Sequence, residues 1–265
     1  MRKILVPVDF SPVSKNAFIY GLHLYKGTDT LFDVVHIYHP SFDPVQPGIL
    51  DDSLDLEHIK AQNLDTFIDS VKDIISQSGV EVNSRLELGF TVEKIVDMSE
   101  EYDLIIMGST GESSLLNKFF GGISSEVAVK AHCPVLLIPS SVKFKGLKNI
   151  IYACDFDGVD DIILKKIIEF TKRYNASLHF VHIQNKNEKF ELKLDTGVPL
   201  KYTINIVEAD SVKEGLSSFI ENKNIDMVIM ATKQRSFWKQ IIHKSLTKEF
   251  ALTSHVPLLV YHEKK

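Results

Sequence analysis

The chain has 265 residues, a length that fits one large domain or two small ones. Hydrophobic residues make up 44% of it and charged residues 25%, the mixture of a globular protein with an ample core. The net charge of -5 gives no reason to expect nucleic acid or a membrane surface as a partner, and neither a membrane span nor a signal peptide is recognised, so we expect a cytoplasmic protein.

Short apolar runs alternate with helical patterns along the first half of the chain. The runs ILVPV, DVVHIY, LELG, DLIIMG and PVLLI predict strands buried on both faces of a parallel sheet. Ser11 and Pro12 predict a helix start, because the serine oxygen caps free N–H groups and proline tolerates the first helical position. Further helices are expected over DLEHIKAQNLDTFIDSVKDIISQSG, VEKIVDMSEEY and SSEVAVKAHC. This alternation predicts right-handed crossovers and a doubly wound sheet.

The second half of the chain repeats the first. NIIYACDFD, FVHI, IDMVIMATK and SHVPLLVYH match KILVPVDFS, VVHI, YDLIIMGST and AHCPVLLIP in the same order. Four ordered matches indicate two homologous domains, which we place at residues 1–142 and 147–265. The second domain is shorter between its second and fourth strands, so a reduced helix or an irregular crossover is expected there. Asp157 is expected to cap the helix that follows its first strand.

A candidate ligand site lies where the strands of the first domain end. In an open parallel sheet, ligands bind beyond the carboxyl ends of the strands, at the point where the strand order reverses. The run from Gly108 to Gly111 offers backbone N–H groups to a phosphate, and Gly121-Gly-Ile-Ser124 precedes a helix whose N-terminus attracts an anion. Asp9 suits an amino group of a base. A second interpretation stays open, in which the glycines only end one element and start the next, and Asp9 only caps a helix.

The spacing Gly108-x2-Gly111-x9-Gly121, the opening ILVPVDFS, the strand VVHI and the ending HCPVLLIP together resemble the universal stress protein family. The resemblance covers essentially the whole chain, as a tandem of two such domains. It implies that each domain is an α/β fold with a five-stranded parallel sheet of order 3-2-1-4-5 flanked by helices, as in adenine nucleotide α-hydrolases. It also implies binding of ATP or another adenine nucleotide, with adenine near Asp9 and Ile37, the phosphates on the glycine-marked loop, and a divalent cation such as Mg²⁺.

The first domain therefore carries a set of candidate nucleotide-binding residues. They are Pro7, Val8, Asp9, Ile37, Gly108, Ser109, Gly111, Gly121, Gly122, Ile123 and Ser124. Gly122 departs from the family, which usually has serine or threonine at this place. The departure removes one hydroxyl donor to phosphate but leaves the backbone amides, and Ser124 and Ser125 can compensate.

The second domain departs further from the family pattern. The three glycines of the loop become Ala231, Gln234 and Lys244, and bulky side chains fall inside the loop. Side chains then occupy the space that backbone amides would need, so we expect no ATP binding of the family's kind in this domain.

Three functions stay open: a stress-response regulator that binds ATP through its first domain, a scaffold that binds only other proteins, and a slow ATPase. No catalytic or metal-binding residue is assigned, because no nucleophile stands beside a base and no ligand cluster has metal spacing. His36 and His182 are expected to be strand histidines with hydrogen-bond partners. The apolar last strand of each domain should lie at a sheet edge, which predicts an internal pseudo-dimer and is compatible with a homodimer of tandem chains.

Overall fold

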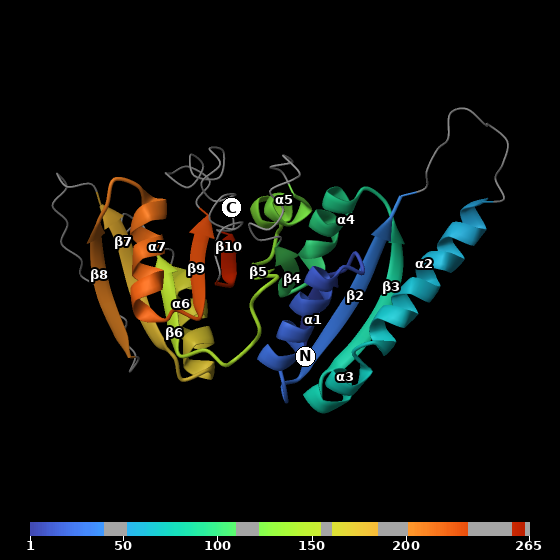
Figure 1. Ribbon diagram of the computed structural model, residues 1–265, viewed down its shortest axis with the longest axis horizontal. Helices are drawn as coiled ribbons and strands as arrows, with labels where there is room; N and C mark the ends of the chain where they lie inside the picture. Colours follow the sequence, from blue (N-terminus) through green and yellow to red (C-terminus); the bar gives the residue numbers. More distant parts are fainter. Residues whose placement is uncertain (40–51, 110–121, 155–160, 185–200, 233–255, 263–265) are drawn as a thin grey trace. The chain divides into compact units, whose positions relative to one another are not determined.

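The computed structural model describes residues 1–39, 52–109, 122–154, 161–184, 201–232 and 256–262 (Figure 1). The chain divides into two compact units. The first unit comprises Met1–Thr110 and Leu116–Phe144, and the second is built on Lys145–Lys265. Among the described residues, no helix combines the length and the apolar character that crossing a membrane requires.

The sheet of the first unit has the predicted strand order. Its strands are β1 (Arg2–Pro7), β2 (Thr30–Tyr38), β3 (Glu81–Leu88), β4 (Leu104–Ser109) and β5 (Val135–Pro139). They run parallel in the order β3-β2-β1-β4-β5. Leu5 of β1 pairs with Asp33 of β2 on one side and with Ile105 of β4 on the other, so β1 lies at the centre. The strand order reverses at the carboxyl end of this central strand.

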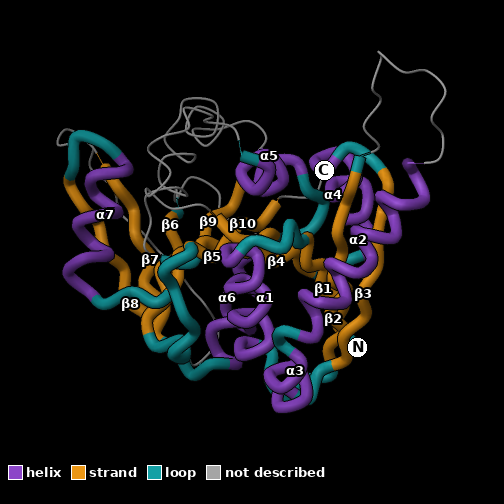
Figure 2. The backbone as a smooth tube through the Cα atoms, turned by 45° about the vertical axis from the view of Figure 1, so that its right-hand side comes forward, coloured by secondary structure: helices purple, strands orange, loops and turns teal. Residues whose placement is uncertain are grey.

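Helices cover both faces of this sheet (Figure 2). They are α1 (Pro12–Leu24), α2 (Asp52–Asp69), α3 (Lys72–Ser78), α4 (Thr91–Met98), the 3₁₀ turn η1 (Ser99–Glu101) and α5 (Ile123–Lys130). Helices α1, α2 and α3 pack on one face, and α4 and α5 pack on the other. Strands β1, β2, β4 and β5 are buried on both sides, with Ile4, Phe32 and Ile105 all fully enclosed, which explains their continuous apolar sequences. The burial on both faces that was predicted for the LELG strand is wrong, because β3 lies at the end of the sheet and most of its residues are exposed.

The helix starts and ends follow local chemistry. As predicted, Ser11 is the N-cap of α1, where its side chain accepts a hydrogen bond from the Ser14 amide, and Pro12 occupies the first turn. The single long helix predicted over residues 55–79 is wrong, because the chain forms two helices that are interrupted at Ser70 and Val71. The Ser70 hydroxyl donates to the Phe67 carbonyl at 2.6 Å, a local bond that competes with the helical ladder.

The second unit repeats the arrangement of the first. Its elements are β6 (Asn149–Ala153), α6 (Asp161–Arg173), β7 (Ser177–Gln184), β8 (Tyr202–Glu208), α7 (Val212–Lys223), β9 (Met227–Thr232) and β10 (Leu258–His262). The parallel order β8-β7-β6-β9-β10 is the same 3-2-1-4-5 pattern. The predicted cap at Asp157 and the expected crossover at 185–200 lie outside the described residues.

A buried asparagine on α1 holds the segment that follows β5. The Asn16 side-chain amide donates to the carbonyls of Pro139 at 3.2 Å and Val142 at 2.9 Å. The Lys143 ammonium donates to the Asn16 oxygen at 2.7 Å, and the Phe144 ring contacts the Tyr20 ring edge-on. The last residues of the first unit are thereby tied to the helix that follows its first strand.

We expect Asn16→Ala to lower the free energy of unfolding of the first unit by ~1–3 kcal/mol, because it leaves buried carbonyl groups without a donor. Urea titration followed by circular dichroism measures this loss. Asn83→Ala on β3 is the control, since Asn83 is exposed and its loss should change stability by less than about 0.5 kcal/mol. Equal effects of the two variants would contradict the anchoring role of Asn16.

Candidate functional site

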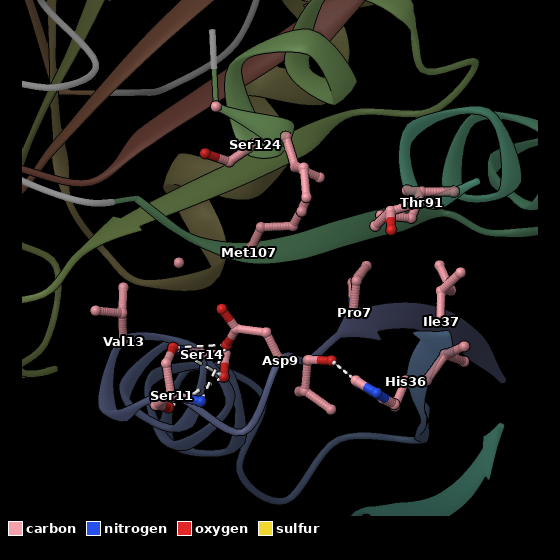
Figure 3. A pocket seen from close by; sticks show the side chains of 16 residues that line it. Pro7, Asp9, Ser11, Val13, Ser14, His36, Ile37, Thr91, Met107 and Ser124 are labelled. Atoms are coloured by element: carbon pink, nitrogen blue, oxygen red, sulfur yellow. Dashed lines mark hydrogen bonds between the residues drawn. The ribbon is translucent and has the colours of Figure 1, made fainter. Parts of the chain in front are cut away.

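A cavity of about 280 Å³ opens at the carboxyl ends of the central strands of the first unit (Figure 3). It lies where β1, β2 and β4 end, next to the first turns of α1, α4 and α5. This is the switch point at which open α/β sheets bind ligands. The volume stands at the lower end of the range of small-molecule sites, roughly 300–1,000 Å³.

Most of the residues predicted for the site line this cavity together. They are Pro7, Val8, Asp9, Ile37, Gly108, Gly122, Ile123 and Ser124. Ser109 ends β4 and is 2% exposed, but it is not a lining residue, and its hydroxyl has no hydrogen-bond partner among the described residues. Gly111 and Gly121 lie outside the described residues. The structure thus brings together four segments that are far apart in the sequence.

Sequence reasoning missed the other residues that line the cavity. They are Ser11, Val13, Ser14, Val35, His36, Thr91, Ile95 and Met107. Val35 could have been predicted from the alternation of side chains along a strand, because it lies on the same face of β2 as Ile37. Thr91 and Ile95 could have been predicted to lie on one face of a helix, because they are four residues apart in a helical pattern that follows a predicted strand. The packing of α4 over β2 depends on the tertiary structure. The sequence therefore gave no signal that the residues of α4 and those of β2 line the same cavity.

The turn between β1 and α1 organises the polar end of the cavity. The Asp9 carboxylate accepts hydrogen bonds from the Ser11 amide at 3.0 Å and the Ser11 hydroxyl at 2.6 Å. Burial alone would raise the pKa of Asp9, but the hydrogen bonds from Ser11 and Ser14 outweigh burial and lower it. Asp9 is therefore ionised near neutral pH. It is the sole acidic side chain among the described lining residues.

The His36 side chain is hydrogen-bonded to the backbone at the start of this turn. Its Nδ1 lies 2.8 Å from the Val8 carbonyl, and because a carbonyl only accepts, Nδ1 carries the proton. Burial, together with the positive charge of Lys60, lowers the pKa of His36, so the ring is neutral near neutral pH. Phe10 has a φ of 64°, an uncommon conformation for a large residue, and its ring packs 4.2 Å from the His36 ring. In the second unit, the Nδ1 atom of His182 lies 3.2 Å from the Cys154 carbonyl, the contact that corresponds to that of His36.

The two described glycines of the loop have different physical roles. A Cβ atom on Gly108 would stand 2.7 Å from Val13 Cγ1 and 2.9 Å from the Val13 carbonyl oxygen, so Gly108 permits the close approach of α1 to β4. A Cβ atom on Gly122 would meet no atom of the described residues within 4 Å. The interpretation that the glycines only end one element and start the next therefore has a physical basis at Gly108. At Gly122, the part of the chain that the structure describes leaves room for a side chain beside the cavity.

Gly122 is also the N-cap of α5 and offers no side chain to cap it. The first helical bonds run from the Ser125 and Glu126 amides to the Gly122 carbonyl, so the amides of the preceding turn have no helical partner. Ser124 lines the cavity on the same helix. An anionic group at this place would meet N–H groups that have no partner within the helix and the positive end of the helix dipole.

A polar network holds α4 at the other side of the cavity. The Lys94 ammonium of α4 lies 2.8 Å from the Glu87 carboxylate of β3. Next to it, Arg85 of β3 donates to the buried Asp33 carboxylate at 3.1 Å, and the Tyr102 hydroxyl also donates to Asp33. These bonds join β2, β3 and the chain on either side of α4.

Comparison with known proteins decides the family of this chain. The sequence model of the universal stress protein family matches residues 1–139. The chain belongs to the universal stress protein family. A curated universal stress protein, MJ0531 of Methanocaldococcus jannaschii, is 30% identical over 146 residues, which are 54% of this chain and 84% of that protein.

Two longer matches agree with a tandem universal stress protein. Slr1230 of Synechocystis is 21% identical over 227 residues, which are 80% of this chain and 78% of that protein. A universal stress protein of Archaeoglobus fulgidus, whose crystal structure is known, has a TM-score of 0.75 and 19% identity and covers 99% of this chain and 97% of its own. The structural similarity supports the α/β fold.

Proposed function

We propose that this universal stress protein binds an adenine nucleotide, ATP or a close relative, in the cavity of its first unit. The observation that carries the proposal is the convergence of residues from β1, β2, β4 and α5, chosen for nucleotide binding from the sequence, on one cavity. Bound nucleotide would make the chain a stress-response regulator whose state depends on occupancy of the site.

The cavity has the two kinds of surface that a nucleotide requires. Pro7, Val35, Ile37, Ile95 and Met107 supply apolar walls suited to a flat purine ring. The side chains of Asp9, Ser11 and Ser14 gather at another part of the cavity, where they can pair with hydroxyl groups of the sugar (Figure 3). The uncapped N-terminus of α5 supplies N–H donors for the phosphates.

Mg²⁺ would reach this site with the nucleotide. No cluster of three potential metal ligands among His, Cys, Asp and Glu exists within the described residues. Among the described residues, the cavity wall contributes one carboxylate, that of Asp9. The other oxygen ligands of Mg²⁺ would therefore come mostly from the phosphates of the nucleotide and from water. The proposal therefore includes Mg²⁺ as part of the ligand.

The remaining assignments complete the proposal. We place the protein in the cytoplasm, where two buried thiols, Cys133 and Cys154, need no oxidising environment. We also propose the internal pseudo-dimer through the last strand of each domain that the sequence predicts, with homodimerisation of the tandem chain as a further step. The second domain, at residues 147–265, is proposed not to bind ATP, and the first, at residues 1–142, hydrolyses it slowly at most.

Isothermal titration calorimetry of the full chain with ATP and Mg²⁺, together with mass spectrometry of nucleotide released from freshly purified protein, tests the proposal. Binding of one nucleotide per chain that Asp9→Ala weakens supports it. Absence of both binding and co-purified nucleotide would favour the protein-binding scaffold. Phosphate release that Asp9→Ala abolishes, at more than a few turnovers per hour (about 10⁻³ s⁻¹, far below ordinary enzymes), would favour the ATPase.

We expect Gly122→Ser to tighten ATP binding about 3- to 10-fold. The added side chain meets none of the described residues, and its hydroxyl can accept from an amide of α5 while it donates to a phosphate oxygen. Calorimetry with ATP and with adenosine measures the effect. The gain should be confined to ATP, because adenosine has no phosphate, and an equal gain for both ligands would contradict the placement of the phosphates at α5.

A further inference from the structure

The hydroxyl of Thr91 has no structural task that the described residues reveal. Thr91 is the first residue of α4, and no hydrogen bond joins its hydroxyl to another described residue. The N-cap of α4 is Phe90, whose side chain cannot cap the helix. Figure 3 shows the Thr91 oxygen pointing into the cavity, toward the space between Pro7 and Ile37.

The second unit shows what the ordinary arrangement looks like. Helix α7 follows the third strand of its sheet, as α4 does in the first unit. Its N-cap is Ser211, whose side chain accepts from the Glu214 amide at 3.2 Å. The second unit thus uses a hydroxyl to cap this helix, whereas the first unit places its hydroxyl one position later, on the wall of its cavity.

Thr91 is also held in place. Lys94, one turn along the same helix, forms its ion pair with Glu87 of β3 at 2.8 Å. Ile95 of α4 is fully buried and shares the cavity wall with Thr91. A hydroxyl that is positioned in this way loses little conformational entropy when it binds a ligand.

We propose that the Thr91 hydroxyl accepts a hydrogen bond from the 6-amino group of the adenine ring. This inference rests on the proposed nucleotide function and deepens it. Thr91 lies among the apolar residues that would enclose the base, opposite Ile37. Asp9, the residue that the sequence suggested for the amino group, lies apart from Thr91 in Figure 3, beside Ser11 and Ser14, and its carboxylate already accepts from Ser11. Thr91 therefore reads the base, and Asp9 is left to the sugar.

The test compares ATP with purine riboside triphosphate, which lacks only the 6-amino group, by calorimetry with Mg²⁺. We expect the unmodified chain to prefer ATP about 3- to 10-fold, the worth of one hydrogen bond. Thr91→Val, which keeps the shape and removes the hydroxyl, should reduce this ratio to about one, and Thr91→Ser should keep it. Asp9→Asn should weaken both ligands equally and leave the ratio unchanged.

The outcomes separate this inference from the function on which it rests. If neither triphosphate binds the unmodified chain, the nucleotide function itself fails. If both bind without preference, or if Thr91→Val retains the preference, or if Asp9→Asn abolishes it, Thr91 does not read the amino group while the nucleotide function stands. Thermal melting of each variant confirms that it is folded, and Thr91→Ser provides the conservative second variant.

Discussion

Gly108→Ala should lower the free energy of unfolding of the first unit by ~1–3 kcal/mol and weaken ATP binding by about tenfold or more. The new Cβ would stand 2.9 Å from the Val13 carbonyl oxygen and 3.0 Å from its carbon, which are backbone atoms and cannot move aside as a flexible side chain can. The first turn of α1 must therefore shift away from β4. That turn carries Ser14 and adjoins Asp9, so stability and binding fall together.

Gly122→Ser is the matched control for stability, because it adds a Cβ atom to the same predicted loop at a place where no described residue lies within 4 Å. Serine is also a good N-cap, so the unfolding free energy should not fall. Urea denaturation of both variants measures the difference in stability, and calorimetry of the Gly108→Ala variant against the unmodified chain measures the loss of ATP binding. A Gly108→Ala variant as stable as the Gly122→Ser variant would show that α1 does not pack against β4 as closely as described.

Asp33→Ala should cost ~1–3 kcal/mol of unfolding free energy. Asp33 is 9% exposed, and its carboxylate accepts hydrogen bonds from Arg85 and Tyr102. Removing the carboxylate leaves these two donors without an acceptor. Removing one partner of a buried ion pair costs ~3–5 kcal/mol, but the Arg85 side chain is 46% exposed and can regain water, which reduces the expected cost. Urea denaturation measures this loss of stability. Asp103→Ala would not serve as a control, because the Asp103 carboxylate accepts a hydrogen bond from the Lys3 amide and its removal would also change stability.

The pH dependence of stability provides an independent test of the same cluster. Burial and the hydrogen bond to Asp33 raise the pKa of Tyr102 to about 12. The folded chain thus holds this proton more tightly than the unfolded chain, whose tyrosines have a pKa of about 10. The contribution of Tyr102 is complete below pH ~10 and is lost as the pH rises toward that of the folded group.

Tyr102→Phe should remove this alkaline loss of stability, and Asp33→Ala should bring the pKa of Tyr102 down toward that of an exposed tyrosine. Urea titrations at a series of alkaline pH values measure the first effect, and the ultraviolet absorbance of the phenolate measures the second. An unchanged alkaline profile in Tyr102→Phe would contradict the burial of this hydroxyl against Asp33.

Local chemistry explains which elements were predictable. Continuous apolar runs such as ILVPV have one stable environment, a strand covered on both faces, and they predicted the parallel sheets. The strand order came from the resemblance to the universal stress protein family, and the structure confirms it. Ser11 and Pro12 defined the start of α1 because capping depends on neighbouring residues alone. The interruption at Ser70 was missed because a serine in a long amphipathic pattern usually lies on the solvent side, and only the structure shows its bond to the Phe67 carbonyl.

The sequence by itself determined the repeated α/β architecture and the strand ends at which a ligand site had to be sought, since periodicity and turn chemistry are local properties. Its motifs also indicated the family, through their resemblance to universal stress proteins. Tertiary structure alone decided which residues share the cavity and what each glycine does. Gly108 and Gly122 look alike in the sequence, but a side chain on Gly108 would meet the backbone of α1, whereas one on Gly122 would meet none of the described residues. Thr91 could be joined to Ile37 only by the packing of α4 over β2, because contacts between distant segments depend on the whole fold.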